Sequence, residues 1–285
     1  MVRSDNRIGQ YLMLAPLGVS AVLIVLLSLA LVFALSFQRV DPIRLFTEFS
    51  WDGYAQNVTR PVFWLVLFRS LLISAAVTAV TLLLSYPVAY FIAFKASRHK
   101  ALLLVLITAP FFTSYLLRIF AWKIILGFNG VVNSALKTVG LIDAPLQFLV
   151  YNPFSVVVAL SHAYLAFAVL PIYVALERID KSLLESASDL GARPFANFRQ
   201  ITLPLSLPGV VAAALLIFVP TVGDYVTPTL VGGPGGIMVG NLIQSQFGKA
   251  NDWPAGSALS VTVILVVGLL LAGIAGGAKL AKRPA

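Results

Sequence analysis

One carboxylate in this sequence occupies a position where a charge is costly. Asp224 is the only acidic residue within the long apolar segments, and ionisable side chains inside a membrane are expensive and commonly functional. Pro220, Gly223 and Pro228 would break a helix around it, which leaves backbone groups that need protein or water beside them. A carboxylate in such a place attracts ammonium groups. Aromatic rings that could add cation–π contacts to the ammonium belong to Tyr225, Tyr115 and Trp122.

Arg118 offers a second interpretation of the same carboxylate. At about 1.5 Å per residue, Asp224 lies about 24 Å along a helix counted from Pro208, and Arg118 about 25 Å along one counted from Ala101. The two side chains would then lie at similar depth. They could form an ion pair that only holds two helices together, so the sequence leaves both roles open.

The residue types needed for catalysis are scarce. The chain has no cysteine and only two histidines, His99 and His162, which excludes thiolate and histidine-based metal sites. No HExxH occurs, and Ser161 and His162 are helix neighbours that do not face each other. An intramembrane aspartyl protease needs two membrane aspartates. The sequence therefore predicts a protein that is not an enzyme, with no catalytic residues, cofactor or metal.

Composition identifies the class of chain that holds these residues. The 285 residues are 59% hydrophobic and 11% charged, with a mean hydropathy of +0.94, whereas soluble domains carry about 25% charged residues. A bilayer-crossing helix needs about 20 mainly apolar residues. We expect an all-α integral membrane protein with one transmembrane domain, 1–285, and six transmembrane helices. Their expected ranges are 12–37, 69–94, 101–126, 155–176, 205–228 and 255–279.

The basic residues predict the orientation. With six helices both termini lie on one side, and that side holds 12 of the 20 Lys and Arg residues, including Arg3, Arg178, Lys282 and Arg283. Lys and Arg accumulate in cytoplasmic segments, so we expect both termini in the cytoplasm. The net charge of +9 is then mainly a topology signal, and nucleic acid is not an expected partner.

The insert between the fourth and fifth helices, residues 177–204, has its own pattern. Asp180 is a suitable N-cap, and apolar residues follow it at helical spacing. Gly191 suits the left-handed residue that ends a helix, and Pro194 suits the first turn of the next one. A surface helix with Glu185 and Asp189 facing water could dock into a groove on a soluble partner. From spacing alone it could equally be a solvated amphipathic loop.

This insert resembles the EAA loop of permease subunits of binding-protein-dependent ABC importers. The chain has Glu-Ser-Ala at 185–187, Gly191, and Ile-Thr-Leu-Pro at 201–204, and it departs from the family at Ser186, where alanine is preferred. The resemblance implies a type I importer permease fold in which the insert is a cytoplasmic coupling helix that fits a cleft in the ATPase. The residues implied to couple the two subunits are Glu185, Ala187, Gly191, Ile201, Leu203 and Pro204.

The resemblance, from about residue 69 to 257, is to the polyamine (spermidine/putrescine) branch of that family. It is carried by SYPVAY at 85–90, PFFTSYLLR at 110–118, and GDYVTP at 223–228 followed by DWP at 252–254. Related permeases for ferric iron, phosphonates and other small solutes share parts of these segments. The implied substrate pathway contains Asp224, Tyr225, Tyr115, Trp122 and Arg118.

The resemblance also implies the assembly. The expected partners are a dimer of ATP-binding-cassette ATPases, a second and related permease, an external solute-binding protein and a small-molecule solute, in a bacterial inner membrane. The chain has no phosphate-binding loop, because Gly248-Lys249 is followed by Ala250 and lacks the upstream glycine. ATP would therefore be bound by the partner. An ATPase-independent secondary transporter is the remaining alternative, although no inverted repeat is evident.

Overall fold

The computed structural model describes residues 7–40 and 47–281. Six helical segments in these ranges are long and apolar enough to cross a membrane, as the sequence predicts. They are Gly18–Leu35, Pro61–Phe94, Tyr115–Thr138, Pro153–Glu177, Pro194–Val222 and Trp253–Gly276. The orientation of the termini stays a prediction, and Arg3, Lys282 and Arg283, on which it partly depends, lie outside the described residues.

The contacts divide the chain into two compact units, residues 1–63 with 243–285 and residues 64–242. The first unit contains α1 (Arg7–Leu35), β1 (Gln38–Val40), β2 (Thr47–Phe49), α2 (Asp52–Thr59) and α12 (Trp253–Ala281). β1 and β2 pair antiparallel, with Arg39 opposite Glu48. The hydroxyl groups of Ser36 and Tyr54 lie 2.6 Å apart, and α12 packs against both α1 and α2.

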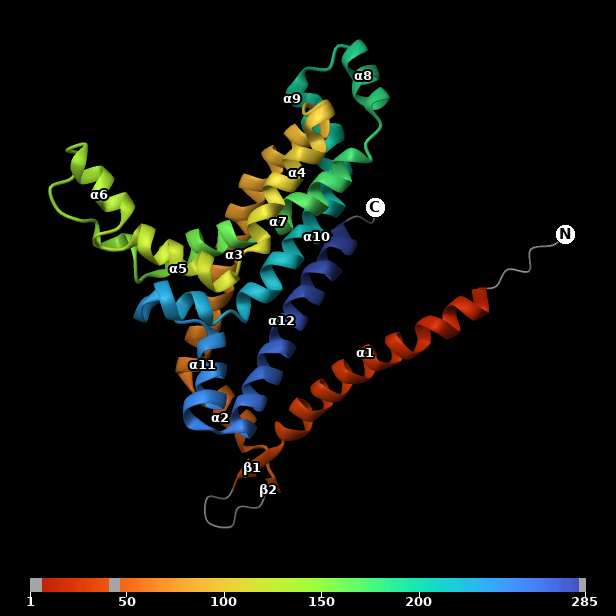
Figure 1. Cartoon of the computed structure of the whole chain (residues 1–285). Coiled ribbons are helices and arrows are strands. Elements are labelled where there is room, and N and C mark those ends of the chain that lie inside the picture. The colour runs from red at the N-terminus through yellow and green to blue at the C-terminus, as the bar shows by residue number, and fades with distance from the viewer. Residues whose placement is uncertain (1–6, 41–46, 282–285) are drawn as a thin grey trace. The chain divides into compact units, whose positions relative to one another are not determined.

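The second unit holds most of α3 (Pro61–Phe94) and all elements through η6 (Pro234–Gly236), and α11 (Val239–Ser245) begins in it. Its remaining helices are α4 (Lys100–Thr108), α5 (Tyr115–Leu126), α6 (Val131–Thr138), α7 (Pro153–Glu177), α8 (Lys181–Asp189), α9 (Pro194–Asn197) and α10 (Leu203–Val222). Fully buried Val77, Ile119, Leu160, Ile172 and Ile217 form the centre of its core. α7 and α10 run side by side, with α8 and α9 at one end of the pair (Figure 1).

The second expected helix, 69–94, begins eight residues earlier, at Pro61. The third and the fifth differ in ways that affect the positions of Arg118 and Asp224. The third, 101–126, is interrupted, because Pro110 lies in a 3-10 turn, Ala109–Phe112, between α4 and α5. Proline lacks the N–H that a continuing α-helix needs. The fifth, expected to run to residue 228, ends at Val222 with Gly223 as its C-cap. Arg118 and Asp224 therefore do not lie on the continuous helices from which their depths were counted.

Gly209 sets the close approach of α7 and α10. A Cβ atom there would lie 2.5 Å from the Ala175 Cβ and 2.6 Å from the Pro171 carbonyl oxygen. Membrane helices commonly place small residues at such contacts because these let the backbones approach. α7 and α10, the two helices that flank the insert, are thus packed directly against each other.

We expect Gly209→Ala to destabilise this helix pair by about 1–3 kcal/mol, the usual cost of overfilling a packed contact. The effect would be measured as a lower unfolding temperature of the purified protein in detergent. Gly268→Ala in α12 is the matched control, since nothing lies within 4 Å of a Cβ added there. Equal unfolding temperatures for the two variants would contradict the close approach.

Candidate functional site

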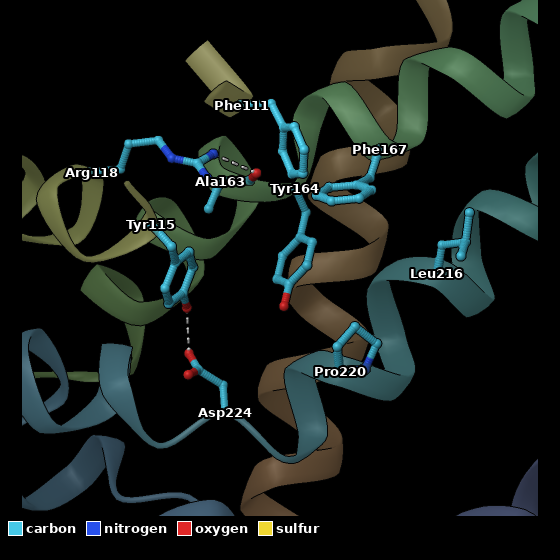
Figure 2. Close-up of a pocket in the computed structure, with 9 residues that line it drawn as sticks. All are labelled: Phe111, Tyr115, Arg118, Ala163, Tyr164, Phe167, Leu216, Pro220 and Asp224. Carbon is cyan, nitrogen blue, oxygen red and sulfur yellow. Dashed lines mark hydrogen bonds between the residues drawn. The ribbon is translucent and has the colours of Figure 1, made fainter. Parts of the chain in front are cut away.

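A pocket lies in the second unit where α5, α7 and α10 meet. Its volume is about 410 Å³, within the range of small-ligand sites, about 300–1,000 Å³. One carboxylate and one guanidinium lie among apolar and aromatic walls (Figure 2). The lining residues are Phe111, Tyr115, Arg118, Ala163, Tyr164, Phe167, Leu216, Pro220 and Asp224.

Asp224 is held at the bend that follows α10. Its Oδ1 accepts a hydrogen bond of 3.0 Å from the Val226 backbone N–H, two residues ahead. Its Oδ2 accepts one of 2.9 Å from the Tyr115 hydroxyl, whose oxygen also lies 2.7 Å from the Thr227 hydroxyl. The carboxylate is half-buried. The end of the helix and the Tyr115 contact together fix it in the pocket wall.

Arg118 lines the same pocket without pairing with Asp224. Its Nη1 donates to the Ala163 carbonyl oxygen at 3.1 Å, and its Cζ lies 5.9 Å from the ring centroids of Phe111 and Tyr115. In the part of the chain that the structure describes, ion pairs join Arg39 to Asp52 and Lys100 to Glu177 only. The structural ion pair considered for Arg118 and Asp224 is therefore not formed.

The structure brings three of the five expected pathway residues together. Asp224, Tyr115 and Arg118 line one cavity, whereas Trp122 and Tyr225 are not among its lining residues. Trp122 meets the His162 ring edge-to-face at 5.5 Å. Tyr225 is 47% exposed, and its carbonyl oxygen accepts a hydrogen bond from the Asn241 side chain.

Sequence reasoning missed the contribution of α7 to the pocket. Ala163, Tyr164 and Phe167 all come from this helix. Residues three and four apart share a helix face, so the pair of Tyr164 and Phe167 was a usable signal. The Phe111 and Phe167 rings meet edge-to-face at 4.6 Å, which forms the apolar wall.

The insert folds as a helix, a turn and a second helix. Asp180 caps α8, because its Oδ1 accepts a hydrogen bond of 3.0 Å from the Ser182 backbone N–H; this bond lowers the pKa of the Asp180 carboxyl. Gly191 has φ +84°, the predicted left-handed conformation. Pro194 begins α9, also as predicted. The Asn197 side chain connects α9 to α8 by donating to the Leu184 carbonyl oxygen and the Ser188 hydroxyl.

The residues implied to couple the insert to an ATPase differ in exposure. Glu185, Gly191 and Pro204 are exposed, Ala187 and Ile201 are half-buried, and Leu203 is 36% exposed. Beside them are exposed apolar side chains: Leu183 is 49% exposed, Leu190 is 89% exposed and Phe195 is 72% exposed. The insert thus presents acidic and apolar groups together, a composition suited to contact with another protein.

Aromatic contacts connect Phe198, which directly follows α9 in the insert, to α3. The Phe198 ring lies 5.8 Å from the Tyr86 ring and 6.2 Å from the Tyr90 ring. The Tyr86 and Ser206 hydroxyl groups lie 2.8 Å apart, and Ser206 is fully buried. A displacement of the insert would therefore reach α3 as well as α7 and α10.

In the ranges 7–40 and 47–281, no group of three or more His, Asp or Glu side chains could hold a metal ion. Two of the described residues that line the pocket carry charge: Arg118 lies in α5, and Asp224 lies at the bend that follows α10. This arrangement suits reversible binding of a small charged molecule.

Six membrane-spanning helices, a charged pocket and a folded insert define a membrane transport component. Residues 6–278 match the family of the binding-protein-dependent transport system inner membrane component, and the chain belongs to this family. It is a multi-pass protein of the bacterial inner membrane. It is 39% identical over 223 residues to the spermidine/putrescine transport system permease protein PotB of Salmonella typhimurium, covering 78% of this chain and 77% of that protein.

Solved structures share the fold. A bacterial ABC transporter that imports the acidic polysaccharide alginate has a chain with a TM-score of 0.73 and 17% identity, with 98% of both chains covered. A second alginate transporter structure, in complex with a pentasaccharide-bound periplasmic protein, gives a TM-score of 0.71 and 15% identity over 100% of both chains. The chain therefore has the fold of an ABC importer permease.

Proposed function

We propose that this chain is the non-catalytic permease subunit of an ATP-driven importer that moves a polyamine, spermidine or putrescine, into the cytoplasm. The main support for this substrate class is the 39% identity to a spermidine/putrescine permease over 78% of the chain. The pocket supports it, because a carboxylate beside aromatic rings is a suitable site for an alkylammonium group.

The proposed energy source is a separate dimer of ATPases that docks on the insert, residues 177–204, in the cytoplasm. In this proposal, ATP is bound by that dimer. The exposed Glu185 and the apolar Leu183, Leu190 and Phe195 support such a docking surface. The ATPases close and open, the insert moves with them, and the transmembrane helices alternate between outward-facing and inward-facing states.

Two further partners complete the proposed importer. The solute comes from an external solute-binding protein, as the family description indicates. A related alginate transporter structure contains a periplasmic protein of this kind. The second permease is a related chain, and the pathway runs between the two permeases past the Asp224 pocket.

The test is uptake by the complete importer in proteoliposomes. The chain is reconstituted with the proposed second permease, ATPases and binding protein, and labelled spermidine and putrescine are supplied outside. We expect uptake that requires both ATP inside and the binding protein outside. Uptake without ATP would indicate a secondary transporter. ATP-driven uptake of ferric iron or a phosphonate, with neither amine transported, would overturn the polyamine assignment.

A further inference from the structure

Arg118 is a cation that forms no ion pair with Asp224, the carboxylate of the pocket proposed to receive a polycation. Its Nη1 donates to the neutral Ala163 carbonyl oxygen, and its Nε is buried with no hydrogen-bond partner. Figure 2 shows the guanidinium directed toward Ala163, with Asp224 on the other side of the Tyr115 ring.

The carboxylate on that other side is already fixed by neutral donors. Asp224 accepts from the Tyr115 hydroxyl and the Val226 backbone N–H, and neither donor carries a charge. The cavity of about 410 Å³ therefore holds one negative and one positive group that are kept apart. Tyr115 separates them, since its hydroxyl contacts Asp224 and its ring lies 5.9 Å from the Arg118 Cζ.

The two ends of a polyamine in this cavity would meet groups of opposite charge. One terminal ammonium is attracted to Asp224, and its alkyl chain packs on the aromatic walls. Any further ammonium in the same cavity approaches Arg118, and like charges at short range in a medium of low dielectric constant repel strongly. The repulsion grows with the number of ammonium groups that the cavity must hold.

We propose that Arg118 is a specificity-determining residue that limits this pocket to one ammonium group at a time. The proposal rests on the proposed function, polyamine import. Arg118 weakens the binding of a triamine more than that of a diamine, so the pocket does not retain a polycation. Passage through a membrane requires binding that is weak enough for the solute to leave.

The experiment compares equilibrium binding of labelled putrescine and spermidine to the complete importer in nanodiscs, without nucleotide or binding protein. Arg118→Gln removes the charge and keeps an N–H donor for the Ala163 carbonyl oxygen. We expect it to bind spermidine about ten-fold more tightly, with a change for putrescine of less than about three-fold. Maximal spermidine uptake would fall because release becomes slower. Arg118→Lys, which keeps the charge, should retain the wild-type ratio of affinities.

Arg118→Met, which also lacks the charge, gives the same test if the glutamine variant does not assemble. Weaker spermidine binding by either neutral variant, equal changes for both amines, or a lysine variant that behaves like glutamine would overturn the proposal. These outcomes differ from failure of the proposed function, in which the assembled wild-type importer would bind and transport neither amine.

Discussion

Gly191→Arg is expected to lower ATP-driven uptake at least about ten-fold, because a left-handed backbone costs a residue with a side chain about 1–2 kcal/mol and the new cation would lie on the proposed docking surface. Gly191 has φ +84° and open space around a Cβ added there. The variant therefore alters the turn and the surface without a steric clash in the core. Uptake into proteoliposomes and co-purification of the ATPase measure the effect.

Two controls separate docking from backbone strain. Asparagine tolerates the left-handed conformation, so Gly191→Asn should keep at least half of the wild-type uptake. Gly140 also has a positive φ, +72°, and open space around it, and it lies outside the insert. Gly140→Arg should leave ATPase association unchanged. Normal uptake by Gly191→Arg would count against the insert as the docking surface.

Asp224→Asn is expected to lower polyamine uptake about 10- to 100-fold, since a hydrogen bond to a charged group is worth about 1.5–3 kcal/mol. The amide keeps an oxygen that can accept from the Val226 backbone N–H, so the bend after α10 should be retained. Uptake of labelled amine would be measured alongside the amount of ATPase bound. The ATPase should bind to the variant as it does to the wild type.

The matched variants for this carboxylate are Tyr115→Phe and Asp252→Asn. Tyr115→Phe keeps the ring and removes only the hydroxyl that donates to Asp224, so its effect should be smaller. Asp252 caps the start of α12 by accepting from the Ala255 backbone N–H and does not line the pocket. Its amide variant should transport normally. Undiminished uptake by Asp224→Asn would exclude Asp224 from the pathway.

Local signals in the sequence predicted the insert well. Asp180, Gly191 and Pro194 are a cap, a left-handed turn and a helix start, and each depends on its own backbone and near neighbours. The number of membrane-spanning helices also follows from the lengths of apolar runs, which need no knowledge of tertiary contacts.

The pocket required tertiary information. Depth counting placed Arg118 and Asp224 at one level and suggested a pair, but the turn at Pro110 and the end of α10 at Val222 give each side chain a different neighbour. α7 packs against α10 at Gly209, and the same helix contributes Tyr164 and Phe167 to the pocket wall. Such contacts between distant segments cannot be obtained from the spacing of residues within one segment.

Residues Pro194–Val222 form one continuous run of 29 helical residues, in which a π-helical stretch, Phe198–Thr202, connects α9 to α10. Its length is about 43 Å at 1.5 Å per residue, and Asp224 follows its far end by two residues. A tilt of about 5° about the midpoint would displace that end by about 2 Å. Linkage between two binding events is reciprocal. If ATPase docking shifts this helix, solute bound at Asp224 would therefore change the affinity of the ATPase for the opposite end of the helix.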